Sequence, residues 1–149
     1  PLADAPVDVV ECDSYTLPAL TNGTYYTGPG GTGTALIAGT VITDTQIVYV
    51  YATNNVCSTD NSFEVKIVPT PLLAIDVPIF TECDQMDFVL TATFAAEETV
   101  YTPDNVIYSW KNLTTGAAAG TGESIIITQA GTYEVTVTPN GGNICAATA

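Results

Sequence analysis

The sequence lacks histidine and arginine altogether, and its 149 residues include only two lysines, Lys66 and Lys111. Histidine is the usual general base near neutral pH, so neither a Ser-His-Asp nor a Cys-His catalytic site can form within the chain. Arginine is the usual clamp for carboxylate and phosphate groups, and none is present. We therefore do not expect an enzyme.

Basic charge is scarce, whereas 16 acidic residues give the chain a net charge of −14. A surface this negative repels nucleic-acid backbones and anionic membrane surfaces. The apolar runs cover only a handful of residues, which is too short to span a bilayer. With 46% hydrophobic and 12% charged residues, the chain is nevertheless too apolar for a disordered acidic tail. We expect a folded protein without nucleic-acid partners and without membrane insertion.

The residues that are abundant favour an all-β fold. The chain has 25 threonines and eight tyrosines, and its 12 glycines and nine prolines are enough to separate many short strands. In the segment 46–52, Tyr49 and Tyr51 alternate with Val48 and Val50, which predicts a strand buried on both faces. The candidate strands are 7–11, 14–18, 24–27, 34–37, 41–43, 46–52, 62–68, 76–81, 86–94, 105–111, 124–128 and 131–138.

The chain contains one internal repeat. Residues 1–17 and 71–90 both open with Pro-Leu and reach Glu-Cys-Asp about ten residues later, at 11–13 and 82–84, an offset of 71 residues. Two alternate prolines, Pro69 and Pro71, lie between the copies and favour an extended linker. We therefore predict two tandem β-sandwich domains, residues 1–70 and 71–149.

The second copy is shorter than the first at its C-terminal end. After Cys57 the first copy continues through a predicted strand, whereas only Ala-Ala-Thr-Ala follows Cys145. We expect the last strand of the second domain to be missing from this chain. Either the sequence is a fragment of a longer array, or a neighbouring chain supplies the strand to an open sheet edge.

Each copy holds two cysteines, and we expect one disulfide within each domain: Cys12–Cys57 and Cys83–Cys145. Four cysteines allow three pairings, and the sequence alone does not choose among them. Disulfides imply an oxidising compartment and therefore export. A zinc ion held by all four thiolates is disfavoured because no CxxC pair is present.

The first copy resembles a known family of repeats. The residues that carry the resemblance are Glu11-Cys12-Asp13, Leu17-Pro18-Ala19-Leu20, Gly23-Thr24-Tyr25-Tyr26-Thr27, Gly30-Gly31-Thr32-Gly33, Ala38-Gly39, Ile47-Val48-Tyr49-Val50-Tyr51-Ala52 and Cys57. They are similar to the immunoglobulin-like repeats of giant secreted Bacteroidota surface adhesins, which are gliding-motility-associated substrates of type IX secretion. The second copy matches more loosely, and its Tyr108-Ser109-Trp110 and Ala130-Gly131-Thr132-Tyr133-Glu134-Val135-Thr136-Val137 are similar to immunoglobulin and polycystic-kidney-disease-type domains.

This resemblance implies an extracellular, cell-surface location, tandem repetition and a role in adhesion. It implies neighbouring repeats of the same protein as partners, together with other copies in a fibre or surface glycans. It supplies no ligand and no catalytic residue.

The candidate binding residues are few, and each has a structural alternative. Trp110 falls where an immunoglobulin-type third strand places a core indole, and Tyr25 and Tyr26 are adjacent and must point to opposite faces. These three residues are the candidates for stacking on a glycan. Calcium is the one metal that the scattered carboxylates suit, although no DxDxDG loop is present. Its candidate ligands are Asp13, Asp76, Asp84 and Asp104.

We therefore expect a spacer segment of a long extracellular adhesin or surface fibre. One alternative is a filament subunit completed by strand exchange with a neighbouring chain. The other is a carbohydrate-binding module that uses Trp110 or the tyrosines.

Overall fold

The computed structural model describes residues 2–77, 87–141 and 145–149. In that part of the chain, strands are the only regular elements apart from two 3₁₀ turns, Pro29–Gly31 and Pro103–Asn105. The all-β prediction is confirmed. The chain divides into two compact units, Pro1–Pro69 and Thr70–Ala149, which we describe separately. No helix among the described residues has the length and hydrophobicity that a membrane-spanning helix requires.

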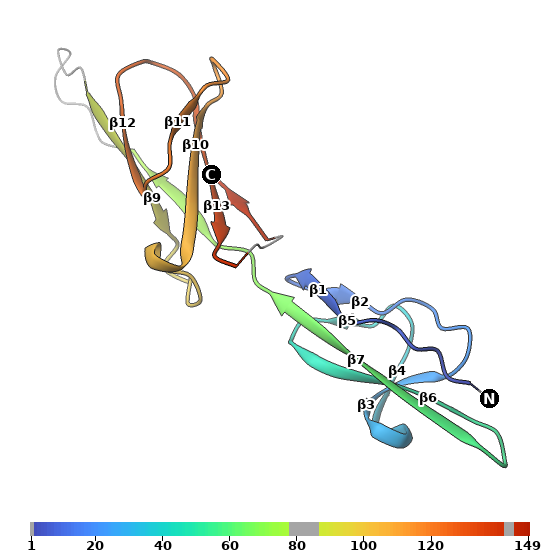
Figure 1. Cartoon of the computed structure of the whole chain (residues 1–149). Coiled ribbons are helices and arrows are strands. Elements are labelled where there is room, and N and C mark those ends of the chain that lie inside the picture. Colours follow the sequence, from blue (N-terminus) through green and yellow to red (C-terminus); the bar gives the residue numbers. More distant parts are fainter. Residues whose placement is uncertain (1, 78–86, 142–144) are drawn as a thin grey trace. The chain divides into compact units, whose positions relative to one another are not determined.

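The first unit has seven strands in two sheets (Figure 1). The strands are β1 (Val9–Cys12), β2 (Tyr15–Thr16), β3 (Thr24–Gly28), β4 (Thr32–Leu36), β5 (Val41–Ile42), β6 (Gln46–Thr53) and β7 (Ser58–Val68). One sheet has the order β1-β7-β6-β3-β4, with β1 parallel to β7, and the other pairs β2 with β5. The third, sixth and seventh strands thus share a sheet opposite the second and fifth, as in immunoglobulin-like sandwiches.

Buried and partly buried residues alternate along β6, and the buried ones show where the core of this unit lies. Val48 and Val50 are fully buried and belong to a cluster with Leu17, Ile42 and Phe63. Tyr49 and Tyr51 lie on the opposite face and are only half-buried, so the prediction that both faces of this strand are buried is wrong for the outer face. The outer face lies on the side of the sheet away from β2 and β5, where no second layer covers it among the described residues.

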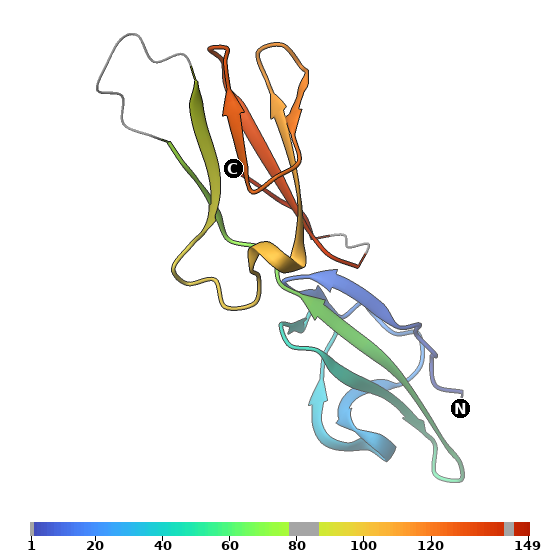
Figure 2. The same cartoon turned by 60° about the vertical axis from the view of Figure 1, so that its left-hand side comes forward.

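The second unit also has seven strands in two sheets. They are β8 (Leu73–Asp76), β9 (Phe88–Phe94), β10 (Val106–Asn112), β11 (Ala118–Gly120), β12 (Ser124–Ile127), β13 (Tyr133–Pro139) and β14 (Ala147–Thr148). The sheet orders are β11-β10-β13-β14 and β12-β9-β8 (Figure 2). This arrangement again places the third, sixth and seventh strands opposite the second and fifth.

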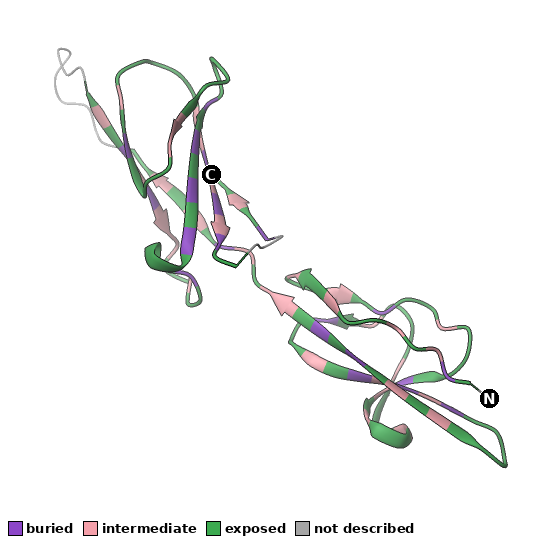
Figure 3. Ribbon diagram, viewed as in Figure 1, coloured by how far each residue is buried: buried purple, intermediate pink, exposed green. Residues whose placement is uncertain are grey.

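Burial in the second unit follows the two-residue period of its strands. Along β10 every second residue is buried, which Figure 3 shows as alternating bands. Trp110 lies at the centre of this core, together with the fully buried Val135 and Val137 of β13 and with Leu90 and Ile125 of the facing sheet.

The sequence predicts that the second domain lacks its last strand, but the structure has a short strand, β14, at the C-terminal end. Ala147 and Thr148 pair antiparallel with Val137 and Thr136 of β13, and Ala149 and Val135 exchange two backbone hydrogen bonds of 3.1 Å. A seventh strand is therefore present in the second unit. A strand of two residues is short enough to escape a search for alternating patterns.

The predicted disulfide Cys12–Cys57 is wrong. Cys57 is a free, exposed thiol, whereas Cys12 and Cys145 are each disulfide-bonded. Cys83, the predicted partner of Cys145, lies outside the described residues.

The register of β1 explains why Cys12 does not reach Cys57. Because β1 runs parallel to β7, Cys12 lies opposite Val68, at the last residue of that strand. Cys57 directly precedes Ser58, the first residue of the same 11-residue strand. At about 3.3 Å per residue the two ends lie roughly 33 Å apart, whereas bridged Cα atoms lie within about 7 Å.

Disulfide mapping tests this connectivity. We expect non-reducing digestion and mass spectrometry to recover no peptide that links Cys12 to Cys57. Alkylation of the folded, unreduced protein should label Cys57, and Cys57→Ser should leave the disulfide-linked peptides unchanged. A peptide linking Cys12 to Cys57 would contradict the register of β1 on β7.

Candidate functional site

Trp110 and Tyr25 are core residues. The Trp110 side chain is 1% exposed, and its indole Nε1–H donates a 2.8 Å hydrogen bond to the carbonyl oxygen of Gly122. Tyr25 is also 1% exposed, and its ring packs at a tilted angle against Phe63, with 6.2 Å between the ring centroids. Neither ring offers a face on which a sugar could stack, so both are wrong as glycan-binding candidates.

Tyr26 lies on the outer face of the large sheet of the first unit. Tyr49 is its direct cross-strand partner, and the ring of Tyr51 meets that of Tyr26 edge-on at 6.3 Å and 80°. All three rings are half-buried. We call this surface, made of Tyr26, Tyr49 and Tyr51, the tyrosine face.

The neighbouring turn uses part of the tyrosine face. Gly31 of the turn Pro29–Gly31 lies so close to Tyr51 that a Cβ on this glycine would meet the ring Cδ1 at 2.7 Å. The backbone N–H of Gly30 donates a 2.9 Å hydrogen bond to Oδ2 of Asp60, the residue opposite Tyr51 on β7. Tyr51 therefore supports the turn, and Tyr26 is the glycan candidate that the structure leaves at the surface.

The acidic side chains do not converge on a metal site. Within the described ranges, no three histidine, cysteine, aspartate or glutamate residues form a group that could hold a metal ion. The structure thus does not bring Asp13, Asp76 and Asp104 together, and Asp84 lies outside the described residues.

Several carboxylates instead accept hydrogen bonds from backbone N–H groups far away in the sequence. Asp4 accepts one from Thr21 at 2.6 Å, and Asp8 accepts one from Glu64 at 2.7 Å. Because the chain has only two lysines and no arginine, these carboxylates accept hydrogen bonds from backbone N–H groups in place of cationic side chains. Such charge-assisted hydrogen bonds fix one chain segment onto another.

Glu98 is the most heavily used carboxylate of this kind. Its Oε2 accepts the N–H of Leu72 at 2.9 Å, and its Oε1 accepts those of Val100 and Tyr101 at 2.8 and 3.1 Å. Partial burial raises the pKa of this carboxyl group, but the backbone hydrogen bonds outweigh burial and leave the pKa below its usual value of 4.5. Glu98 thereby ties the β9–β10 loop to the segment before β8.

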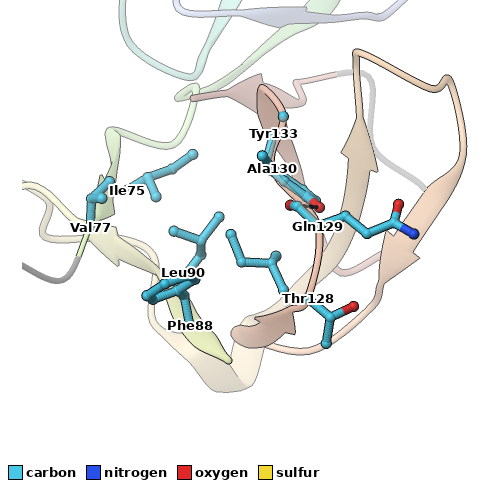
Figure 4. Close-up of a pocket in the computed structure, with 10 residues that line it drawn as sticks. Ile75, Val77, Phe88, Leu90, Thr128, Gln129, Ala130 and Tyr133 are labelled. Atoms are coloured by element: carbon cyan, nitrogen blue, oxygen red, sulfur yellow. Dashed lines mark hydrogen bonds between the residues drawn. The ribbon is translucent and has the colours of Figure 1, made fainter. Parts of the chain in front are cut away.

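An apolar groove in the second unit was not predicted from the sequence. It has a volume of about 460 Å³ and lies where β8 and β9 of one sheet face β13 of the other. Its apolar lining comes from Ile75, Val77, Phe88, Leu90, Ile127 and Tyr133, which surround a common space in Figure 4. The alternating pattern in the sequence shows that these side chains face inward, but it does not show that the space between them is unfilled.

Comparisons with known proteins identify no family. No family model matches the chain, and no curated protein matches it. Among solved structures, the N-terminal four Ig domains of Dscam1 isoform 6.9 align with 95% of this chain and 42% of their own, at 16% identity and a TM-score of 0.41. The titin domains z1z2, solved in complex with telethonin, align over 99% of this chain and 91% of theirs, at 13% identity and a TM-score of 0.34. This chain spans less than half the length of the Dscam1 structure.

Substitution of Glu98 tests its role in stability. We expect Glu98→Gln to lower the free energy of unfolding at pH 7 by roughly 1 kcal/mol, because the backbone N–H groups of Leu72, Val100 and Tyr101 lose a charged acceptor. The exposed Glu97 offers a matched control, and Glu97→Gln should change the stability much less. Urea denaturation measures both effects.

The lowered pKa of Glu98 also predicts how the stability difference between the wild type and Glu98→Gln changes with pH. The folded-state pKa of Glu98 is below 4.5, so its contribution is complete above that pH and is lost as the pH falls through the folded-state pKa. The difference between the wild type and Glu98→Gln should therefore shrink in acid. A difference that grows on acidification would contradict the arrangement.

Two buried phenols provide a further test. The hydroxyl groups of Tyr25 and Tyr108 are buried and have no hydrogen-bond partner among the residues that the structure describes. Burial, followed by the nearby Tyr15 and Asp4 for Tyr25 and by Glu123 and Asp104 for Tyr108, raises the pKa of each phenol. We expect Tyr25→Phe and Tyr108→Phe to leave the protein equally stable or more stable, because an unpaired buried hydroxyl group is removed.

Tyr133→Phe is the matched control for these substitutions. The Tyr133 hydroxyl donates a 2.9 Å hydrogen bond to the carbonyl oxygen of Gln129, and its removal should cost about 1 kcal/mol. Thermal unfolding of the three variants measures the contrast. A large loss of stability in Tyr108→Phe would show that its hydroxyl group has a partner in solution.

Proposed function

We propose that the chain is a structural segment of a secreted, cell-surface repeat protein. In this proposal the two units are tandem immunoglobulin-like domains that act as rigid spacers for adhesion and catalyse no reaction. Their partners are neighbouring repeats of the same protein. The resemblance of residues 1–70 to repeats of Bacteroidota surface adhesins motivates the finer proposal of a role in gliding motility and secretion by the type IX route.

This proposal rests on the side chains that could have bound a ligand, because most of them pack or form hydrogen bonds within their own unit. The single tryptophan is a core residue, and Tyr25 is buried beside Phe63. The carboxylates of Asp4, Asp8 and Glu98 are occupied by backbone N–H groups. Side chains that pack or form hydrogen bonds in this way stabilise the unit in which they lie. A spacer requires such a stable fold.

The cysteine chemistry supports an extracellular location. Cys12 and Cys145 are each disulfide-bonded, and a disulfide is stable in an oxidising compartment but is reduced in the cytosol. The excess of acidic residues would also keep a secreted array soluble and prevent adhesion between its own repeats.

The tyrosine face supports one alternative, a carbohydrate-binding module. Aromatic rings at a surface stack on sugars, and Tyr26 is half-buried with its ring edge-on to Tyr51. The same face lacks arginine, so a neutral saccharide is the class that it would take.

Light scattering and calorimetry separate these two functions. A spacer of 15.5 kDa should elute as a monomer and show no saturable heat with neutral oligosaccharides. Saturable binding that Tyr26→Ala abolishes, and that Val41→Ala on the exposed part of β5 leaves intact, would support the carbohydrate-binding module and overturn the spacer.

A further inference from the structure

Two asparagine residues of this chain are followed directly by glycine, at Asn22-Gly23 and Asn140-Gly141. In such a pair the backbone nitrogen of the glycine can attack the side-chain amide of the asparagine, because glycine has no Cβ to hinder the approach. All four residues are exposed. Two reactive pairs therefore lie at the surface, and their hydrogen bonds distinguish them.

Hydrogen bonds to another segment hold Asn140 in place. Its side-chain Nδ2 donates a 3.3 Å hydrogen bond to the carbonyl oxygen of Asp104, and its backbone N–H donates a 2.9 Å hydrogen bond to the carbonyl oxygen of Asn105. The side chain must break its hydrogen bond and turn toward Gly141 before the amide can react. We therefore expect the reaction to be slow at Asn140 in the folded chain.

The side-chain amide of Asn22 has no hydrogen-bond partner among the residues that the structure describes. The backbone carbonyl oxygen of this residue accepts a 3.0 Å hydrogen bond from the N–H of Asp4. Attack by Gly23 joins the Gly23 nitrogen to the side-chain carbon, and the backbone carbonyl remains a carbonyl. The amide of Asn22 can therefore react without first losing a hydrogen bond of its own.

Packing against β6 requires a glycine after Asn22. Gly23 has a φ of +109°, and a Cβ added to it would meet Cγ1 of Val50 at 2.9 Å and the backbone oxygen of Tyr51 at 3.1 Å. Val50 is fully buried and cannot move aside easily. Any other residue at this position would strain the backbone and clash with the core. The fold thus fixes the residue that makes Asn22 reactive.

We propose that Asn22 is a site of spontaneous covalent modification, at which the side-chain amide is lost through attack by the backbone nitrogen of Gly23. A bond forms between this nitrogen and Cγ of Asn22, and the Cγ–Nδ2 bond breaks. Nδ2 leaves as ammonia, and the proton that it gains balances the proton that the Gly23 nitrogen loses. Water then opens the resulting succinimide ring. Opening at Cγ yields an aspartyl residue, whereas opening at the backbone carbonyl carbon yields an isoaspartyl residue.

The modification loosens the contact between this loop and the segment that contains Asp4. The Asp4 carboxylate accepts the N–H of Thr21 at 2.6 Å, and the Asp4 N–H donates to Asn22. Both products add a negative charge near this carboxylate, in a chain whose net charge is already −14, so repulsion weakens the contact. The isoaspartyl product also lengthens the main chain by one carbon before Gly23, which must then shift from its close contact with Val50.

Peptide mapping by mass spectrometry tests the site in the full chain. After incubation in a mildly alkaline buffer, the amide should be lost from Asn22 at least about tenfold faster than from Asn140, because the hydrogen bonds at Asn140 must break first. In urea both pairs are freed from the fold and should react at similar rates. Labelling by an isoaspartyl methyltransferase identifies the isoaspartyl product.

Two variants connect the reaction to its effect on stability. Asn22→Gln keeps an amide at this position but requires a less favourable six-membered ring, so residue 22 should stay unmodified during the same incubation. Asn140→Gln is the matched control and should leave the reaction at Asn22 unchanged. Incubation should lower the melting temperature of the wild type and of Asn140→Gln, and it should lower that of Asn22→Gln much less.

Three results would overturn the proposal. The first is retention of the Asn22 amide in the folded chain, and the second is an equal rate at Asn22 and Asn140 in the folded chain. The third is an unchanged melting temperature once Asn22 is modified, because the contact with Asp4 would then not be loosened. None of these results bears on whether the chain is a spacer or the tyrosine face binds a saccharide.

Discussion

The ladder between the sixth and seventh strands is the constraint on which each unit depends. In the first unit, β7 pairs with β6 along its full length, and this pairing buries Val48, Val50, Phe63 and Val65 on one face. The same pairing sets the tyrosine face on the opposite side of the sheet. In the second unit β14 pairs with Thr136 and Val137 of the sixth strand, β13. Val135 and Val137 of β13 are fully buried, as Val48 and Val50 are in the first unit.

The imbalance of charge shapes the fold in a second way. A chain with 16 acidic residues and two lysines cannot pair most of its carboxylates with cations. Asp4, Asp8 and Glu98 instead accept backbone N–H groups across separations of 17, 56 and 26 residues. Asp4 thereby holds the N-terminal segment to the loop at Thr21, Asp8 holds the segment before β1 to β7, and Glu98 holds the β9–β10 loop to the segment before β8. The acidic residues thus hold irregular segments in place and also keep the surface negative.

The surface that remains for binding is small and of two kinds. The tyrosine face is aromatic and partly used by the turn at Pro29–Gly31. The groove is lined by apolar side chains of the second unit. A flat aromatic surface suits a sugar ring, whereas an apolar groove suits an apolar group, so the two surfaces differ in the chemistry that they could bind. A spacer requires neither, and saccharide binding at the tyrosine face would contradict that function.

Local pattern was sufficient for much of this structure. Composition and two-residue alternation predicted the all-β class, which the structure confirms. Trp110 falls where an immunoglobulin-type third strand places a core indole, and the structure buries it. Composition alone excluded histidine-based catalysis within the chain, because that inference needs no coordinates. Side-chain direction along a strand repeats every two residues, so the sequence carries this information in each short segment.

Only the tertiary structure decided which distant residues meet. The separation of Cys12 from Cys57 depends on β1 lying parallel to β7, and no local pattern encodes the direction in which two separate strands align. Tyr25 is buried while the adjacent Tyr26 reaches the surface, and this difference depends on which side of β3 the second sheet covers. The groove likewise exists because β8 and β9 of one sheet face β13 of the other without filling the space between them. Alternation along the chain therefore determined the strands and their faces. Strand register and sheet pairing, which join residues far apart in sequence, determined which cysteines are kept apart and where the binding surfaces lie.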